Sequence, residues 1–429
     1  MRPQSATIDS PSRRLLVLLP PSAVMVLCVS WFAAFNLRSG FIGLGPALPT
    51  LTADLGLSFS QASVLAAIPT LMMGLMAIPG GTCADHWGPA RVITLGLALV
   101  TCGGLRAAAP VFPLLLAVTV VFGAGIGLSQ PSLPRLMRMW FPQRLGVSTG
   151  IYASGMITGS VVAASVTGPL LAWLNRPDAW RTPLALWGAT SALTLLIWVV
   201  AMRPWRAPRL PVVQPALGVV AEVIAWSPWR HRSAWLAAAY FAAQGLIYYL
   251  LVAWLPAIYG EAGVSPAATA GLFVVFNGST LPAIVLFPSW SDRIGRRRPL
   301  ALTAGVMVLA GIVGLLVLPV ADPWRWLWPF LLGCGVSGAF AMSLVMPADL
   351  APRGRTGAAA GMVLAIGYTG SALGPILAGV VRDVTGSFHT TLLVLPAIAV
   401  AMIGLATATP ELVPRGRSLQ EGDAVHGEQ

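Results

Sequence analysis

The sequence contains no lysine and carries little charge of either sign. Only 9% of its 429 residues are charged, whereas soluble proteins average about a quarter. Hydrophobic residues make up 56% of the chain, and a water-soluble surface cannot be built from such a composition. The composition excludes soluble enzymes, nucleic-acid-binding modules and disordered scaffolds. It predicts an integral membrane protein with no nucleic-acid partner.

Cysteine is scarce, and the common catalytic motifs are missing. The four cysteines show no paired spacing, so they indicate neither disulfides nor a metal site. No nucleophile elbow, zinc-binding helix motif or phosphate-binding loop is present in the sequence. We therefore expect no enzyme activity and no cofactor.

Twelve apolar runs are long enough to cross a membrane as helices. They are predicted at residues 22–49, 60–82, 91–109, 113–138, 146–174, 182–202, 233–258, 267–290, 299–319, 325–347, 356–381 and 388–408. Within hydrocarbon a helix satisfies all of its own backbone hydrogen bonds. The expected fold class is an all-α membrane protein with twelve transmembrane helices.

The distribution of arginine sets the expected orientation. Of the 26 basic residues, 20 fall in segments that face the cytoplasm if both termini lie inside, and four fall in outer loops. The other two, Arg38 and Arg106, lie within apolar runs. We expect a multi-pass protein of the bacterial inner membrane, surrounded by lipid, with both termini in the cytoplasm.

The two halves of the chain repeat each other with a shift close to 209 residues. The matches, in order, are Phe32–Ala34 with Phe241–Ala243, Asp85/Gly88/Arg91 with Asp292/Gly295/Arg298, Gly123/Gly125 with Gly333/Gly335, and Arg144/Gly146/Gly150 with Arg355/Gly357/Gly361. A duplicated bundle of this kind can rock about a central site and expose it to each side in turn. The repeat therefore favours a carrier over a channel or a membrane enzyme.

The expected organisation has five parts, which follow from the runs and the polar stretches between them. They are a cytoplasmic segment (1–21), a six-helix bundle (22–202), a cytoplasmic linker (203–232), a second six-helix bundle (233–408) and a disordered tail (409–429). Residues 215–226 of the linker are predicted to form a short helix on the membrane surface.

The loop between the second and third runs reads Gly81-x3-Asp85-x2-Gly88-x2-Arg91. This pattern resembles the signature of the major facilitator superfamily, and the chain from Asp292 to Arg298 resembles its second copy. Residues 35–58 and 248–256 are similar to the cyanate and 2-nitroimidazole permease group of that superfamily. The resemblance implies a transporter built from two pseudo-symmetric six-helix bundles.

In that superfamily the signature residues make charged contacts across the cytoplasmic helix ends and hold one gate shut. The matching residues of this chain are Asp85, Arg91, Arg144, Asp292, Arg298 and Arg355. The alternative is that these residues only anchor the helices at the cytoplasmic surface.

Charges inside a bilayer are costly, so each is a candidate for the substrate site. Arg38 lies near the middle of the first run, where its planar fork of donors suits an anion. The alternative is a structural arginine that binds carbonyl groups at a helix break near Gly40. Arg106 lies near the outer end of the third run, where it reaches either the site or the membrane surface.

Polar and aromatic residues at similar depth complete the predicted site. Tyr240, Gln244 and Tyr248 are spaced four residues apart in the seventh run, and Tyr249 is adjacent. Hydroxyl and amide groups of this kind can orient a small polar solute, although packing between helices is the alternative. Weaker candidates are Gln130, Tyr152, Asn277 and Tyr368.

None of the fourteen acids and none of the four histidines is predicted to lie in mid-membrane. Carriers that exchange protons usually hold a titratable group there. The sequence therefore predicts a monomeric secondary carrier for a small anion or a compact electronegative solute. The alternatives are a drug exporter of the same fold and a membrane sensor that does not transport.

Overall fold

The computed structural model describes residues 21–141, 145–203, 227–317, 323–351 and 356–411. In these ranges every regular element is a helix. The first half contains α1 (Pro21–Ile42), α2 (Leu44–Leu55), α3 (Phe59–Trp87), α4 (Pro89–Cys102), η1 (Gly103–Ala108), α5 (Phe112–Trp140), α6 (Leu145–Leu174), η3 (Pro177–Trp180) and α7 (Arg181–Met202). The second contains η4 (Pro228–Arg230), α9 (Arg232–Glu261), α10 (Pro266–Gly278), α11 (Thr280–Ile294), α12 (Arg298–Val317), η5 (Pro323–Trp326), α13 (Leu327–Leu350), α14 (Thr356–Ser371), α15 (Leu373–Thr385) and α16 (Phe388–Ala408).

Within the described ranges, twelve helices or broken helices are long and apolar enough to cross a membrane, as the sequence predicted. The predicted runs missed three breaks, which separate α1 from α2, α10 from α11, and α14 from α15. The helices before these breaks end at Ile42, Gly278 and Ser371, each four residues before a proline. A proline has no N–H to donate to that carbonyl, and its ring crowds the carbonyl.

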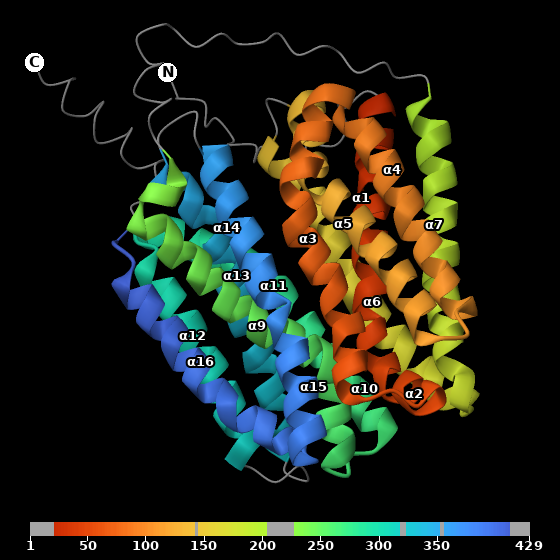
Figure 1. Ribbon diagram of the computed structural model, residues 1–429. Coiled ribbons are helices and arrows are strands. Elements are labelled where there is room, and N and C mark those ends of the chain that lie inside the picture. Colours follow the sequence, from red (N-terminus) through yellow and green to blue (C-terminus); the bar gives the residue numbers. More distant parts are fainter. Residues whose placement is uncertain (1–20, 142–144, 204–226, 318–322, 352–355, 412–429) are drawn as a thin grey trace, which may run out of the picture.

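The helices form two groups, one for each half of the chain (Figure 1). One end of the molecule, the arginine-rich end, carries the start of α1, the end of α16 and residues such as Arg91 and Arg298. The opposite end carries the turns that follow α2, α9 and α15. In Figure 1 the two groups stand apart at the arginine-rich end and meet at the opposite end.

Glycines of the sequence repeat lie at equivalent helix crossings in the two halves. A Cβ atom on Gly125 of α5 would lie 2.5 Å from the Gly96 carbonyl oxygen of α4. A Cβ atom on Gly335 of α13 would lie 2.9 Å from the Ala304 carbonyl oxygen of α12. These helix pairs approach so closely because their glycines have no side chain.

The signature loops repeat as well, because each of them contains a glycine with positive φ. Gly88 between α3 and α4 has a φ of 86°, and Gly295 between α11 and α12 has a φ of 76°. Residues with a Cβ atom rarely adopt positive φ, so glycine is required in each copy.

Several predictions concern residues outside the described ranges. These are the surface helix at 215–226, nearly all of the terminal segments, Arg144 and Arg355. The limits proposed for the five parts of the chain stay predictions.

We expect Gly125→Ala and Gly335→Ala each to lower the melting temperature of the purified protein, because the added methyl group forces the backbones apart. Overpacking of this kind costs about 1–3 kcal/mol. Gly150→Ala is the matched control, since a Cβ atom there meets no atom within 4 Å. Equal melting temperatures for all three variants would contradict the close crossing.

Candidate functional site

A cavity of about 420 Å³ lies between the two halves. Helices α1, α3, α5 and α6 of the first half and α9, α11, α13 and α14 of the second line it. Its walls include Pro134, Thr149 and Leu344, which lie close to the arginine-rich ends of their helices. The cavity therefore extends from mid-depth toward that end.

At the opposite end the two halves are joined by a set of polar contacts that we call the seal. The carboxylate of Asp383 on α15 accepts hydrogen bonds from the backbone N–H groups of Phe59 (2.9 Å) and Ser60 (2.7 Å), and one from the Ser60 hydroxyl. It thus caps the N-terminus of α3, where a negative charge is stabilising. Trp254 of α9 donates its indole N–H to Ser63 of α3 at 3.1 Å. The two halves are therefore joined at this end, whereas the cavity between their described residues extends toward the arginine-rich end.

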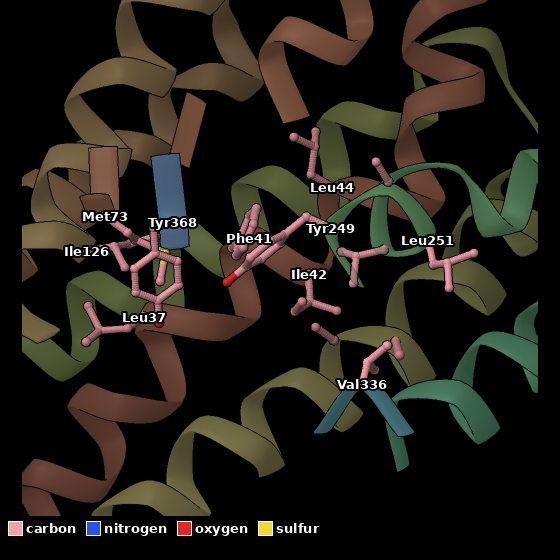
Figure 2. Close-up of a cluster of buried hydrophobic side chains, with 14 of the residues drawn as sticks. Leu37, Phe41, Ile42, Leu44, Met73, Ile126, Tyr249, Leu251, Val336 and Tyr368 are labelled. Carbon is pink, nitrogen blue, oxygen red and sulfur yellow. The ribbon is translucent and has the colours of Figure 1, made fainter. Parts of the chain in front are cut away.

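Arg38 is the only charged side chain among the described residues that line the cavity. Its side chain is 9% exposed, and its Nη1 donates a hydrogen bond to the Tyr249 hydroxyl at 3.3 Å. No carboxylate in the described ranges forms an ion pair with it. The bond joins the halves, because Arg38 belongs to α1 and Tyr249 to α9. In Figure 2 the ring of Tyr249 lies beside that of Phe41, with ring centres 5.4 Å apart.

Helix α1 is fixed to the first half on both sides of Arg38. Two residues earlier, the Asn36 amide donates to Thr194 of α7 at 2.7 Å and accepts from Thr190 at 2.9 Å. Two residues later, the Gly40 carbonyl accepts from Nη2 of Arg106 at 3.2 Å. These bonds hold the Arg38 backbone in one place relative to the first half.

Arg106 is neither in the cavity nor at the membrane surface, the two places that the sequence left open. It is 2% exposed, and its guanidinium lies 3.9 Å from the centre of the Phe122 ring. Its Nε donates to the Gly103 carbonyl at 2.8 Å. Arg106 thus binds helix carbonyl groups, the structural role that the sequence had offered as an alternative for Arg38.

Hydroxyl and amide groups surround Arg38 on the second half and on α5. Gln130 of α5 donates to the Tyr368 hydroxyl of α14 at 2.7 Å, which is a second bond between the halves at the cavity, beside that of Arg38 with Tyr249. The rings of Tyr248 and Tyr249 meet edge to face with centres 4.9 Å apart. Gln244 and Tyr152 also line the cavity. The arrangement places one cation among tyrosine rings and amides.

Tyr240 and Asn277 do not line the cavity. The Tyr240 hydroxyl donates to the Ala301 carbonyl at 3.0 Å, and the Asn277 amide donates to the Phe273 carbonyl. In an α-helix, two residues that are eight apart point in directions that differ by about 80°, whereas two residues that are seven apart differ by only about 20°. Phe241, seven residues before Tyr248, is accordingly the residue that lines the cavity. A spacing of seven residues from Tyr248 is the sequence signal that could have identified Phe241.

A model of the Major Facilitator Superfamily matches residues 27–375 and, in a second match, residues 290–422. The chain belongs to this superfamily. The cyanate transport protein CynX of Escherichia coli is 29% identical over 91% of this chain and 97% of that protein. The 2-nitroimidazole transporter of Escherichia coli is 27% identical over 87% of this chain and 91% of that protein.

The fold is shared with solved transporters. The inward-open structure of the xylose transporter XylE from E. coli matches with a TM-score of 0.73 at 14% identity, over 94% of this chain and 99% of that one. Family and fold together make this chain a multi-pass inner-membrane transporter and not an enzyme, as the sequence predicted.

The signature residues of the superfamily are described in part. Asp292 pairs with Arg297 at 2.6 Å. Arg297 also binds Asp349 of α13 at 2.9 Å. Arg298 instead donates to the Thr409 carbonyl at 3.1 Å. These three bonds all lie within the second half.

In the first half, Arg91 lies exposed on α4. The side chain of Asp85 is outside the described part of the chain, as are Arg144 and Arg355. The gating role of the six signature residues stays a prediction.

We expect Asp383→Ala to open the opposite end, because three hydrogen bonds between the halves are lost. The measurement is the rate of maleimide labelling of Ser63→Cys in a background without the four native cysteines. Ser63 is fully buried, so labelling should become several-fold faster. Asp178→Ala is the control, since Asp178 pairs with Arg176 within the first half. An unchanged rate would show that the seal does not depend on Asp383.

Proposed function

We propose that the protein carries a small anion or a compact electronegative molecule across the inner membrane by alternating access. Candidate substrates are cyanate-like anions, nitro-heterocycles and small carboxylates. The observation that carries the proposal is Arg38, the single charge that lines the cavity in the described residues. A buried cation without a carboxylate partner favours a ligand that brings the negative charge.

The other walls limit the substrate further. One guanidinium matches one negative charge, and it can bind two oxygens of a planar group at once. Tyrosine rings and the amides of Gln130 and Gln244 offer hydrogen bonds around it, while Phe241 and Phe340 supply apolar surface. These features support a monovalent, flat substrate. The names of CynX and of the 2-nitroimidazole transporter, which this chain resembles, fit that class.

The proposed cycle alternates between closure at the seal and closure at the cytoplasmic end. The arginine-rich end faces the cytoplasm by the distribution of basic residues, so the state described is open to the cytoplasm. In the other state the seal separates and the signature residues close the cytoplasmic end. If transport is coupled to protons, a weakly acidic substrate brings its own, because no acid lines the cavity in the described ranges.

A drug exporter is the second candidate and is less well supported. Exporters of cationic drugs usually bind them with a carboxylate in the membrane, and the cavity offers an arginine instead. Raised tolerance to drugs in cells that overproduce the protein would favour the exporter.

We expect a small anion to stabilise the wild-type protein in a thermal-shift screen, and Arg38→Gln to lose about half or more of that stabilisation. Binding to the folded state adds about 2.7 kcal/mol at a hundredfold excess over Kd. Loss of the charged contact weakens binding about tenfold or more. Arg176→Gln, exposed and far from the cavity, is the control. Stabilisation only by bulky apolar compounds, unchanged in Arg38→Gln, would contradict the proposal.

Tyr249→Phe tests the position of the Arg38 side chain and not its charge. The substitution leaves the guanidinium in place and removes only the hydroxyl to which it donates. We expect a smaller loss of anion affinity than in Arg38→Gln, with the preference for anions kept. Anion binding indistinguishable from wild type would remove Tyr249 from the site.

Both termini are proposed to lie in the cytoplasm. A C-terminal fusion to green fluorescent protein should therefore fluoresce in cells, while a fusion to alkaline phosphatase should be inactive. The reverse pattern would mean that the arginine-rich end, and the cavity that extends toward it, face the periplasm.

A further inference from the structure

We propose that a second cavity, at the opposite end of the second half, binds the phosphate head group of an anionic membrane lipid. This cavity measures about 470 Å³. The last turns of α9 and α12, η5, the start of α13 and the start of α16 enclose it. It shares no lining residue with the central cavity, and its described walls all come from one half. A ligand there would be bound and not transported.

Three hydrogen-bond donors in this cavity have no acceptor among the described residues. Arg325 forms no ion pair in the described ranges, and its guanidinium lies 5.7 Å from the centre of the Trp326 ring. The hydroxyl of Tyr259, a residue 3% exposed, has no hydrogen-bond partner. The indole N–H of Trp328 is also buried without one. A cation with two neutral donors matches an anionic group that carries several acceptor oxygens.

The acid in the wall does not cancel this charge. Glu261 already pairs with Arg382 at 2.5 Å through one oxygen and accepts the Phe388 backbone N–H at 2.9 Å through the other. Arg382 in turn lies over the ring of Phe59 of the first half. Both carboxylate oxygens of Glu261 are therefore already bonded, and Arg325 is the cation of this cavity that no described carboxylate pairs with.

The surroundings select a lipid over a free anion. Leu315, Leu316 and Leu392 line the cavity beside the polar groups. Next to lining residues in the sequence, Val317 is 72% exposed and Trp324 is 60% exposed. Exposed tryptophan at the ends of transmembrane helices marks the level of lipid head groups. An amphiphile with a phosphate group and an apolar body fits these walls.

The test is native mass spectrometry of the delipidated full-length protein in detergent. It compares adducts of phosphatidylglycerol with those of phosphatidylcholine of equal chain length, and a parallel thermal-shift arm adds inorganic phosphate alone. The variants are Arg325→Gln and Tyr259→Phe, which removes one hydroxyl and keeps the ring. Arg176→Gln, an exposed arginine at the same end of the first half, is the control.

We expect one phosphatidylglycerol adduct to be retained by the wild type and by Arg176→Gln. In Arg325→Gln its affinity should fall about tenfold, and in Tyr259→Phe by a smaller factor. Equal retention of the two lipids, or equal retention by Arg325→Gln and the wild type, would overturn the proposal. Stabilisation by inorganic phosphate without retention of lipid would show that the cavity binds free phosphate, and it would overturn the proposal of a lipid ligand.

Discussion

The buried guanidinium of Arg38 is the constraint on which the site depends. A charge at this depth is costly unless it is paired, and no described carboxylate pairs with it. The protein holds it in place through neighbouring backbone and side chains, because Asn36 binds α7 and Gly40 binds Arg106. Its own donors face a cavity in which one hydroxyl, that of Tyr249, accepts a bond. In the proposed function the substrate completes the pairing.

One helix, α9, carries both a contact of the site and a contact of the seal. On α9, Tyr249 meets Arg38, and five residues later Trp254 bonds to Ser63 of α3. When the second half turns relative to the first, both sets must change together. Such coupling lets an event at the substrate site alter the seal without a separate relay.

The architecture could be predicted because the length of an apolar run shows where a helix crosses the membrane. The repeat could be recognised because glycines recur at a nearly constant shift between the two halves. The depth and importance of Arg38 followed from its position within a run. The sequence left open a helix break near Gly40, but the breaks could not be placed in the predicted runs because other prolines, such as Pro69 and Pro131, lie within unbroken helices. Of the predicted stripe, Gln244 and Tyr248 line the cavity and Tyr240 does not, because a spacing of eight residues drifts off one face of a helix. The place of Arg106 depends on tertiary contacts that no local pattern encodes, since Gly40 and Phe122 belong to other helices.

The most direct test is isothermal titration of the purified wild-type protein with matched pairs of small monocarboxylates and their neutral amides. The members of each pair have nearly equal shape, so the difference isolates the charge that Arg38 meets. We expect the carboxylate to bind about tenfold more tightly, or better, in every pair that binds. Equal affinities, or tighter binding of the amide, would contradict the assignment of Arg38 as the partner of an anionic substrate.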